Sequence, residues 1–146
     1  MQVKLLDERG ERTYAVVFEQ GDEAMAGLQE VAKREGLAAS RLTAVGGFRR
    51  ATLGYFSAER KDYQPIPVDE QVEVLSLIGD ITQTDSGPQV HAHVVVGRAD
   101  GTTRGGHLLE GHVWPTLEVI VTESPTHLRR RFDPAVGIPL IDLASR

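Results

Sequence analysis

The chain has 146 residues, a formal net charge of -5 at pH 7 and no cysteine. This length is typical of one domain with a buried core, so we predict a single domain over residues 1–146. The missing cysteines exclude a disulfide framework, and the acidic charge argues against general binding of nucleic-acid backbones. No stretch approaches the roughly 20 apolar residues of a membrane span, and residues 1–7 lack the apolar core of a signal peptide, which predicts a cytoplasmic protein without a membrane partner.

The first predicted elements are two short strands, at 2–6 and 13–18, around a polar turn at 7–11. A helix follows, because apolar residues recur at helical spacing from residue 24 to residue 32. Asp22 is a suitable N-cap for this helix, and Gly36 is the glycine expected where it ends.

Alternating apolar and polar residues predict the remaining strands. They fall at 42–45, 50–56, 63–68, 71–78, 89–97, 104–109 and 116–122. A turn at glycines 46–47 ends the first of them, Pro65 and Pro67 mark an edge strand, and residues 124–146 are predicted to be mostly loop. One helix and about eight strands with short connections predict an α+β domain, with a mostly antiparallel sheet that curls toward a barrel.

The most informative motif is a pair of histidines followed by a third. His91 and His93 are two residues apart in an apolar run, so they share one face of a strand. After a turn at 99–101, a loop of three residues would pair His93 with His107, whereas a loop of two would place His107 on the opposite face. With an odd loop, or a bulge at glycines 105–106, three imidazoles share one face and predict a site for zinc or another divalent metal.

Two alternatives to an open metal site remain at this point. The three histidines could be separate, half-buried residues of a hairpin, or the metal could be purely structural. Three nitrogen ligands without a cysteine favour an open site, because closed structural zinc sites usually have four protein ligands.

Other charged residues give weaker indications. Glu118, in the apolar strand 117–121, either faces solvent or approaches the metal as ligand, supporting residue or base. Arg50 either holds a substrate carboxylate or forms a surface salt bridge. We treat both as weak candidates for catalytic residues. The arginines at 129–131 suggest an anion site, but in an acidic chain a solvated face or subunit ion pairs are favoured.

Four segments together resemble one known family. Residues 105–111 (GGHLLEG) and 115–120 (PTLEVI) resemble motifs of the PPC domain, the plants and prokaryotes conserved domain. Residues 50–56 (RATLGYF) fit its bacterial branch, and residues 73–79 (EVLSLIG) match a further motif of the family. The resemblance runs from about residue 14 to about residue 122, with 123–146 as a C-terminal tail. The resemblance implies a small α+β barrel-like domain that forms a homotrimer and binds zinc through the positions of His91, His93 and His107. The fold also resembles that of acetolactate decarboxylase.

The function expected from this resemblance is a trimeric zinc-binding domain with an open site and an undefined activity. A small anionic ligand is expected at the metal. The alternatives are a metal-dependent lyase or hydrolase acting on a small carboxylate or carbonyl compound, and a DNA-associated regulatory or assembly domain. Plant members of the family bind DNA through a separate Arg-Gly-Arg-Pro hook, which this sequence lacks, so we do not expect this chain to bind DNA by itself.

Overall fold

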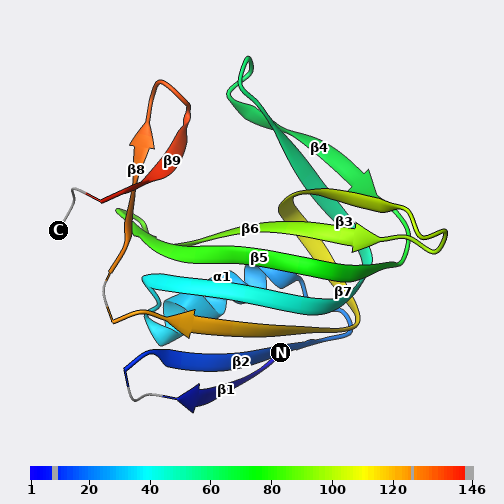
Figure 1. The fold of residues 1–146 in the computed structure, drawn as a ribbon, viewed down its shortest axis with the longest axis horizontal. Helices are drawn as coiled ribbons and strands as arrows, with labels where there is room; N and C mark the ends of the chain where they lie inside the picture. The colour runs from blue at the N-terminus through cyan, green and yellow to red at the C-terminus, as the bar shows by residue number, and fades with distance from the viewer. Residues whose placement is uncertain (8–9, 126, 144–146) are drawn as a thin grey trace.

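The computed structural model shows a strongly curled sheet with a helix against one of its faces (Figure 1). The model describes residues 1–7, 10–125 and 127–143. Within these residues the elements are β1 (Gln2–Asp7), β2 (Arg12–Glu19), α1 (Ala24–Glu35), β3 (Ala39–Ser57), β4 (Asp62–Val68), β5 (Val72–Thr84), β6 (Gly87–Gly97), β7 (Thr103–Glu123), β8 (Arg129–Asp133) and β9 (Ile138–Asp142).

The nine described strands form one sheet. Its order is β1-β2-β7-β3-β5-β8-β9, with β4 paired to β3 and with β6 paired to both β5 and β7. The strands that carry most of the sheet pair in the antiparallel sense, and β5 and β8 meet in a short parallel contact. The predicted α+β class with a mostly antiparallel sheet is therefore confirmed. The sheet curls, as expected, without closing into a barrel.

The helix α1 begins and ends close to the predicted positions, but its capping residue differs. Glu23, not Asp22, is the N-cap, and its carboxylate accepts hydrogen bonds from the backbone N–H groups of Met25 at 3.1 Å and Ala26 at 2.6 Å. Asp22 instead accepts a bond from the backbone N–H of Glu19 at 3.0 Å. Gly36 ends the helix in the left-handed conformation with φ of 63°, as predicted.

Two predicted breaks in the sheet do not exist. The glycines at 46–47 lie inside the continuous strand β3, and β7 likewise joins the strands predicted at 104–109 and 116–122. A Cβ atom at Gly46 would lie 2.3 Å from the carbonyl oxygen of Thr116, and one at Gly47 would lie 2.4 Å from that of Trp114. These glycines therefore allow the backbone of β7 to approach β3 closely, and they do not form a turn.

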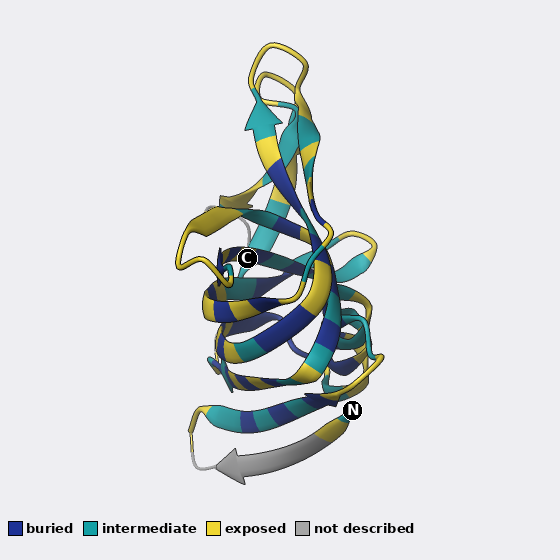
Figure 2. Cartoon of the chain, turned by 90° about the vertical axis from the view of Figure 1, so that its right-hand side faces the viewer, coloured by how far each residue is buried: buried dark blue, intermediate teal, exposed yellow. Residues whose placement is uncertain are grey.

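The sheet has a core face and an outer face. The helix α1 buries its apolar side chains against the core face, and alternate residues of β6, such as Val90, Ala92 and Val94, point into the same core. Figure 2 shows this alternation as dark blue and yellow bands along the strands. His91 and His93 point to the outer face. This outer face also carries apolar side chains that are 42–58% exposed: Val45, Leu75, Ile78, Val95 and Ile120.

Two hairpins project from the same side of the sheet (Figures 1 and 2). One is formed by the end of β3 and β4, and the other by β8 and β9, in the segment predicted to be mostly loop. They meet near their tips, where the Lys61 ammonium donates a hydrogen bond to the carbonyl oxygen of Pro134 at 3.1 Å. We call the two joined hairpins the hairpin arch. Positions 126 and 144–146 of the predicted tail lie outside the described residues.

Within residues 1–7, 10–125 and 127–143, no helix has the length and apolar character needed to cross a membrane.

Candidate metal centre

The structure brings His91, His93 and His107 together on the outer face of the sheet. His93 pairs directly with His107 across β6 and β7, and His91 lies two residues earlier on the same face. One ligand nitrogen from each ring lies within 4.8 Å of the others. The ring centroids are 5.0 Å apart for His91 and His93, 5.2 Å for His91 and His107, and 5.5 Å for His93 and His107.

The turn between β6 and β7 sets this register. The backbone N–H of Arg98 donates to the carbonyl oxygen of Thr102 at 2.9 Å, which leaves the predicted odd loop of residues 99–101 between them. The Asp100 carboxylate accepts a bond from the backbone N–H of Thr102 at 3.0 Å, and Gly101 takes a positive φ of 81°. Local turn chemistry therefore places His107 on the face of His93.

The environment of His93 and His107 lowers the pKa of both imidazoles, which favours their neutral form. Burial, and then the neighbouring His91 and His93, lower the pKa of His107 to about 4. Burial and His91 also lower the pKa of His93, although Asp80 opposes this shift. Metal ligation requires neutral imidazole, and the buried Nδ1 of His107 has no hydrogen-bond partner among the described residues. The donor set thus fits a divalent metal ion.

Two further residues hold His91. Its Nδ1 lies 3.4 Å from Oδ2 of Asp80 and 3.1 Å from Nη2 of Arg130, and the same guanidinium nitrogen lies 2.9 Å from Oδ1 of Asp80. Although burial favours protonation of Asp80, its hydrogen bonds with His91 and Arg130 hold the pKa of the carboxyl below its usual value. When Nδ1–H of His91 donates to Asp80, Nε2 is unprotonated and is left for a metal, an arrangement common around ligating histidines, and the Arg130 guanidinium then bonds to Asp80 and not to the ring.

The sequence did not single out Asp80 or Arg130 as site residues. Asp80 lies just beyond the strand predicted at 71–78, and Arg130 lies in the segment predicted to be mostly loop. The side chain of Arg130 is only 10% exposed. Its neighbours behave as the favoured interpretation expected, since Arg129 pairs with Asp85 at 3.2 Å and Arg131 with Asp142 at 3.3 Å.

A small cavity lies beneath the hairpin arch, beside the histidines. Its volume is about 190 Å³, and its walls come from β4, β6, β7, β8 and β9. The Tyr63 ring of β4 stacks on His107 with 4.3 Å between centroids, and Arg130 and Leu140 close the opposite side. We call this space the arch cavity. It partly covers His91 and His107, while His93 lies on the open outer face of the sheet.

Neither weak catalytic candidate is brought to this cluster. Glu118 is exposed on β7, where it pairs with Val17 and Val45. At the level of Glu118, β7 pairs with β3, and the strands β3 and β5 lie between this part of β7 and β6, so Glu118 is separated from His93 across the outer face. The exposed Arg50 guanidinium lies 3.0 Å from Nε2 of His112, a surface hydrogen bond away from the histidine cluster.

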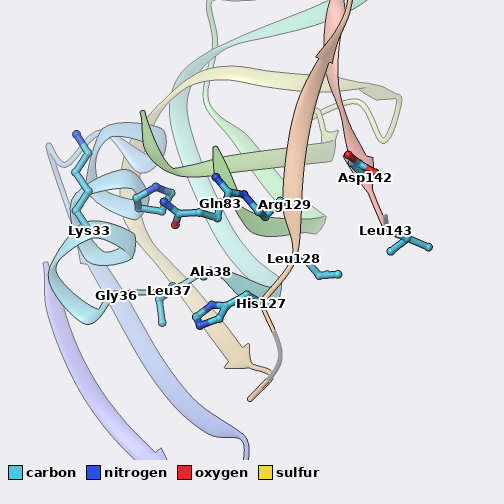
Figure 3. Close-up of a pocket in the computed structure, with 11 residues that line it drawn as sticks. Lys33, Gly36, Leu37, Ala38, Gln83, His127, Leu128, Arg129, Asp142 and Leu143 are labelled. Carbon is cyan, nitrogen blue, oxygen red and sulfur yellow. The ribbon is translucent and has the colours of Figure 1, made fainter. Parts of the chain in front are cut away.

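A larger cavity lies elsewhere, at the end of α1. Figure 3 shows its wall, formed by the end of the helix, by β5 and by the segment leading into β8, with a volume of about 770 Å³. Lys33, Gln83, His127 and Arg129 contribute its polar groups. The size suits a small molecule. The three-histidine cluster does not line this cavity.

Comparison with known proteins identifies the family. Residues 6–125 match the model of the Plants and Prokaryotes Conserved (PCC) domain. A curated relative, the bifunctional protein GlmU of Synechococcus sp. strain JA-3-3Ab, is 32% identical over 129 residues, which is 86% of this chain and 20% of the relative. The chain therefore spans only about a fifth of the length of the curated relatives that it matches.

Solved structures show the same fold. A plant- and prokaryote-conserved protein of Pyrococcus horikoshii is 30% identical, with a TM-score of 0.85 and coverage of 99% of this chain and 97% of that one. A protein of Archaeoglobus fulgidus described as metal-containing is also 30% identical, with a TM-score of 0.82 and 96% coverage of both chains.

Two other solved structures bear on function and fold. A protein of Ralstonia eutropha JMP134, described as a putative DNA-binding protein, is 29% identical, with a TM-score of 0.82 and coverage of 89% and 90%. A Staphylococcus aureus protein of unknown function, similar to alpha-acetolactate decarboxylase, shares the fold at 15% identity and a TM-score of 0.55, with coverage of 79% of this chain and 53% of that one.

Proposed function

Because the chain belongs to the Plants and Prokaryotes Conserved domain family, we propose that it is a trimeric zinc-binding protein with an open three-histidine site. The observation that carries the proposal is the convergence of His91, His93 and His107, whose ligand nitrogens lie within 4.8 Å of one another. The Archaeoglobus fulgidus relative described as metal-containing supports it. We also propose a cytoplasmic location, in keeping with a chain that has no cysteine.

Zinc is the metal that suits this donor set best. Imidazole ligands bind several transition metals, and three nitrogens with one open position are typical of non-structural zinc sites. Three neutral ligands do not reduce the charge of the ion, which favours a small anion or hydroxide at the open position. A bound zinc would supply Lewis acidity, either toward a carbonyl group or toward a water molecule.

An enzymatic role is the second candidate, and the arch cavity favours it. A small enclosed space directly beside a metal site suits a lyase or hydrolase that acts on a small carboxylate or carbonyl compound. In such a role, the histidines would hold the metal, and Asp80 and Arg130 would orient His91. The activity itself stays undefined in this proposal, and neither Glu118 nor Arg50 is given a catalytic role.

Self-association is supported by two separate apolar surfaces. The outer face exposes Ile78 by 58% and Ile120 by 45%, while the C-terminal hairpin and the residue after it expose Phe132 by 60% and Leu143 by 83%. Exposed apolar areas of this kind mark interaction sites. Because the two surfaces are different, a head-to-tail contact that closes into a ring would cover both. The number of three subunits rests on the resemblance to the family.

A DNA-associated role has less support. The Ralstonia eutropha relative is described as a putative DNA-binding protein, but the net charge of -5 provides little attraction for a phosphate backbone. The activity of the much longer GlmU relatives belongs to those whole proteins, and we do not propose it for this chain.

Metal analysis of the purified protein tests the main proposal. We expect about one zinc ion per chain after zinc supplementation and dialysis, and far less than one in the His93→Ala variant. The matched control is His112→Ala, which removes a histidine that pairs with Glu110 outside the cluster and should leave the zinc content unchanged. Equal zinc content in wild type and His93→Ala would refute the site.

A further inference from the structure

Two residues that line the arch cavity each carry a buried polar atom without a hydrogen-bond partner among the described residues. Oε1 of Gln89 and Nδ1 of His107 are the buried side-chain atoms without a hydrogen bond in the described part of the chain, and both residues line this cavity. Unsatisfied buried polar atoms destabilise a protein, and in native structures they often mark a place where something binds. A metal bound through Nδ1 of His107 would satisfy that atom. The amide oxygen of Gln89 still requires a hydrogen-bond donor.

The position of Gln89 relates it directly to the metal ligands. Gln89, His91 and His93 alternate along β6 and so project from the same face, while Val90 and Ala92 point into the core. Gln89 therefore lies about 7 Å along the strand from His91. A ligand of a few atoms that binds the metal could reach this amide oxygen.

The other walls of the cavity limit what such a ligand can be. The Arg130 guanidinium donates to Thr82, Pro139 and Asp80, so its charge and its donors are already matched within the protein. Tyr63 and residues 138–140 add mainly apolar surface, and the described lining residues include no carboxylate. A volume of about 190 Å³ is roughly that of six water molecules. The space suits a small ligand with one charged end.

We infer that the arch cavity is the ligand pocket of the metal site and that it selects small hydroxycarboxylates. The carboxylate occupies the open position of the metal, whose charge the three neutral histidines leave uncompensated. The hydroxyl group donates a hydrogen bond to Oε1 of Gln89, which satisfies the unpaired acceptor. This inference rests on the proposed function, because it requires a metal on the histidines.

Calorimetric titration of the zinc-loaded protein with glycolate and with acetate tests this inference. The two acids differ by one hydroxyl group. We expect glycolate to bind roughly three- to tenfold more tightly than acetate, the effect of one hydrogen bond. Gln89→Met removes the acceptor at similar side-chain length, so it should abolish this preference while the affinity for acetate and the zinc content stay unchanged.

Two further variants complete the experiment. Gln83→Met makes the same change in the larger cavity of Figure 3 and should keep the preference for glycolate. Gln89→Glu places a negative charge beside the proposed anion and should weaken the binding of both acids by tenfold or more, which keeps the test valid if Gln89→Met folds poorly. Circular dichroism and melting curves establish that each variant is folded.

The possible outcomes separate this inference from the proposed function. If the protein binds no zinc, both fail. If it binds zinc but neither acid, or both acids equally, the metal site stands and the pocket assignment is overturned. A preference for glycolate that persists in Gln89→Met would show that the hydroxyl binds the metal itself, and would also overturn the role of Gln89.

Discussion

The imidazole of His91 is held by two residues that are distant in the sequence. Asp80 approaches from the neighbouring strand β5, and Arg130 approaches from the C-terminal hairpin, both at the Nδ1 atom of the ring. A carboxylate that accepts the Nδ1–H bond fixes the tautomer and the orientation of a metal-binding histidine, so Asp80 acts on His91 directly and Arg130 acts by holding Asp80. Asp80 and Arg130 are therefore positioning residues, which support the site without contacting the metal.

We predict that Asp80→Asn lowers the affinity for zinc by roughly 10- to 100-fold, the usual effect of losing a carboxylate behind a ligating histidine. The neutral amide holds His91 less strongly, and Arg130 loses its partner charge. Competition with a chromogenic zinc chelator measures the affinity.

The matched control for this prediction is Glu118→Gln, the same kind of change on the outer face but away from the cluster. It should leave the affinity unchanged. Equal affinities in Asp80→Asn and wild type would remove Asp80 from the site, whereas a fall in Glu118→Gln would bring Glu118 back to it.

The sequence predicts some residues of the site and not others. His91, His93 and His107 are predictable because strand alternation and a short turn fix their relative positions locally. Asp80 and Arg130 cannot be predicted in this way, because the contact between them depends on a short parallel pairing of β5 and β8 that no local sequence pattern indicates. Gln89 could have been noticed from its spacing to His91, but only burial beneath the arch distinguishes it from a surface glutamine.

At the scale of elements, the β8–β9 hairpin is attached to the sheet by few contacts. The paired residues of β5 and β8 are Gln83 and Arg129, and the backbone N–H of Gln83 donates to Leu128 at 2.8 Å. A two-stranded hairpin is only marginally stable by itself. The side chain of Arg130, which bonds to Thr82 and Asp80, is thus a main attachment of the hairpin to the sheet.

We predict that Arg130→Met loosens this hairpin and lowers the free energy of unfolding by about 1–3 kcal/mol, because charged hydrogen bonds are lost and Asp80 is left without its cation. Hydrogen exchange followed by mass spectrometry should show faster exchange over residues 129–142 in this variant.

Arg131→Met is the control for that change. Its side chain, next in sequence, is 74% exposed and bonds to Asp142 within the hairpin, so its replacement should have little effect on exchange. If the two variants exchange alike, Arg130 is not what attaches the hairpin.

The type of most elements was predictable, but some of their limits were not. Alternation identified the strands and helical spacing identified α1, because these patterns reflect burial on one face. The sequence predicts the end of a strand at Gly46, because glycine commonly ends strands. In the structure, Gly46 lies inside β3, and its lack of a side chain allows the backbone of β7 to approach closely. That role depends on where β7 passes, which is a property of the tertiary structure.

At the scale of the whole molecule, the two apolar surfaces predict assembly. Light scattering at micromolar concentration should give the mass of three copies of the 16.0 kDa chain. Ile120→Lys introduces a charge into the outer face, several strands from the histidines, and should shift the population toward monomer while the zinc content is retained. Ala26→Lys, on the exposed side of α1, is the control. A monomeric wild type would contradict the proposed trimer.

The charge of the whole chain predicts weak interaction with DNA. With a net charge of -5, binding would release few counterions, so we expect no complex with an AT-rich duplex at submicromolar protein concentration. Electrophoretic mobility shifts at several salt concentrations measure this. A tight complex that weakens as salt rises would instead support a DNA-associated role.

The resemblance of four short segments to one family anticipated the architecture of the whole chain, and the match over residues 6–125 confirms that family. Contacts between subunits leave no comparable pattern in the sequence, because an exposed apolar residue on a strand cannot be told from a buried one by the alternation alone. The outer face could be recognised as an unusual surface only after α1 was placed on the opposite side.

The pairings of β7 have a consequence for the order of folding. Its first half pairs with β6 across a short turn, whereas its second half pairs with β2, so that Arg12 lies opposite Glu123. Local pairings form quickly, while distant ones wait for a long loop to close. The three proposed metal ligands all belong to the local part, so we expect the histidine hairpin to capture zinc before the N-terminal strands join the sheet. Pulsed hydrogen exchange during refolding with and without zinc should then show the metal protecting β6 and β7 ahead of β2.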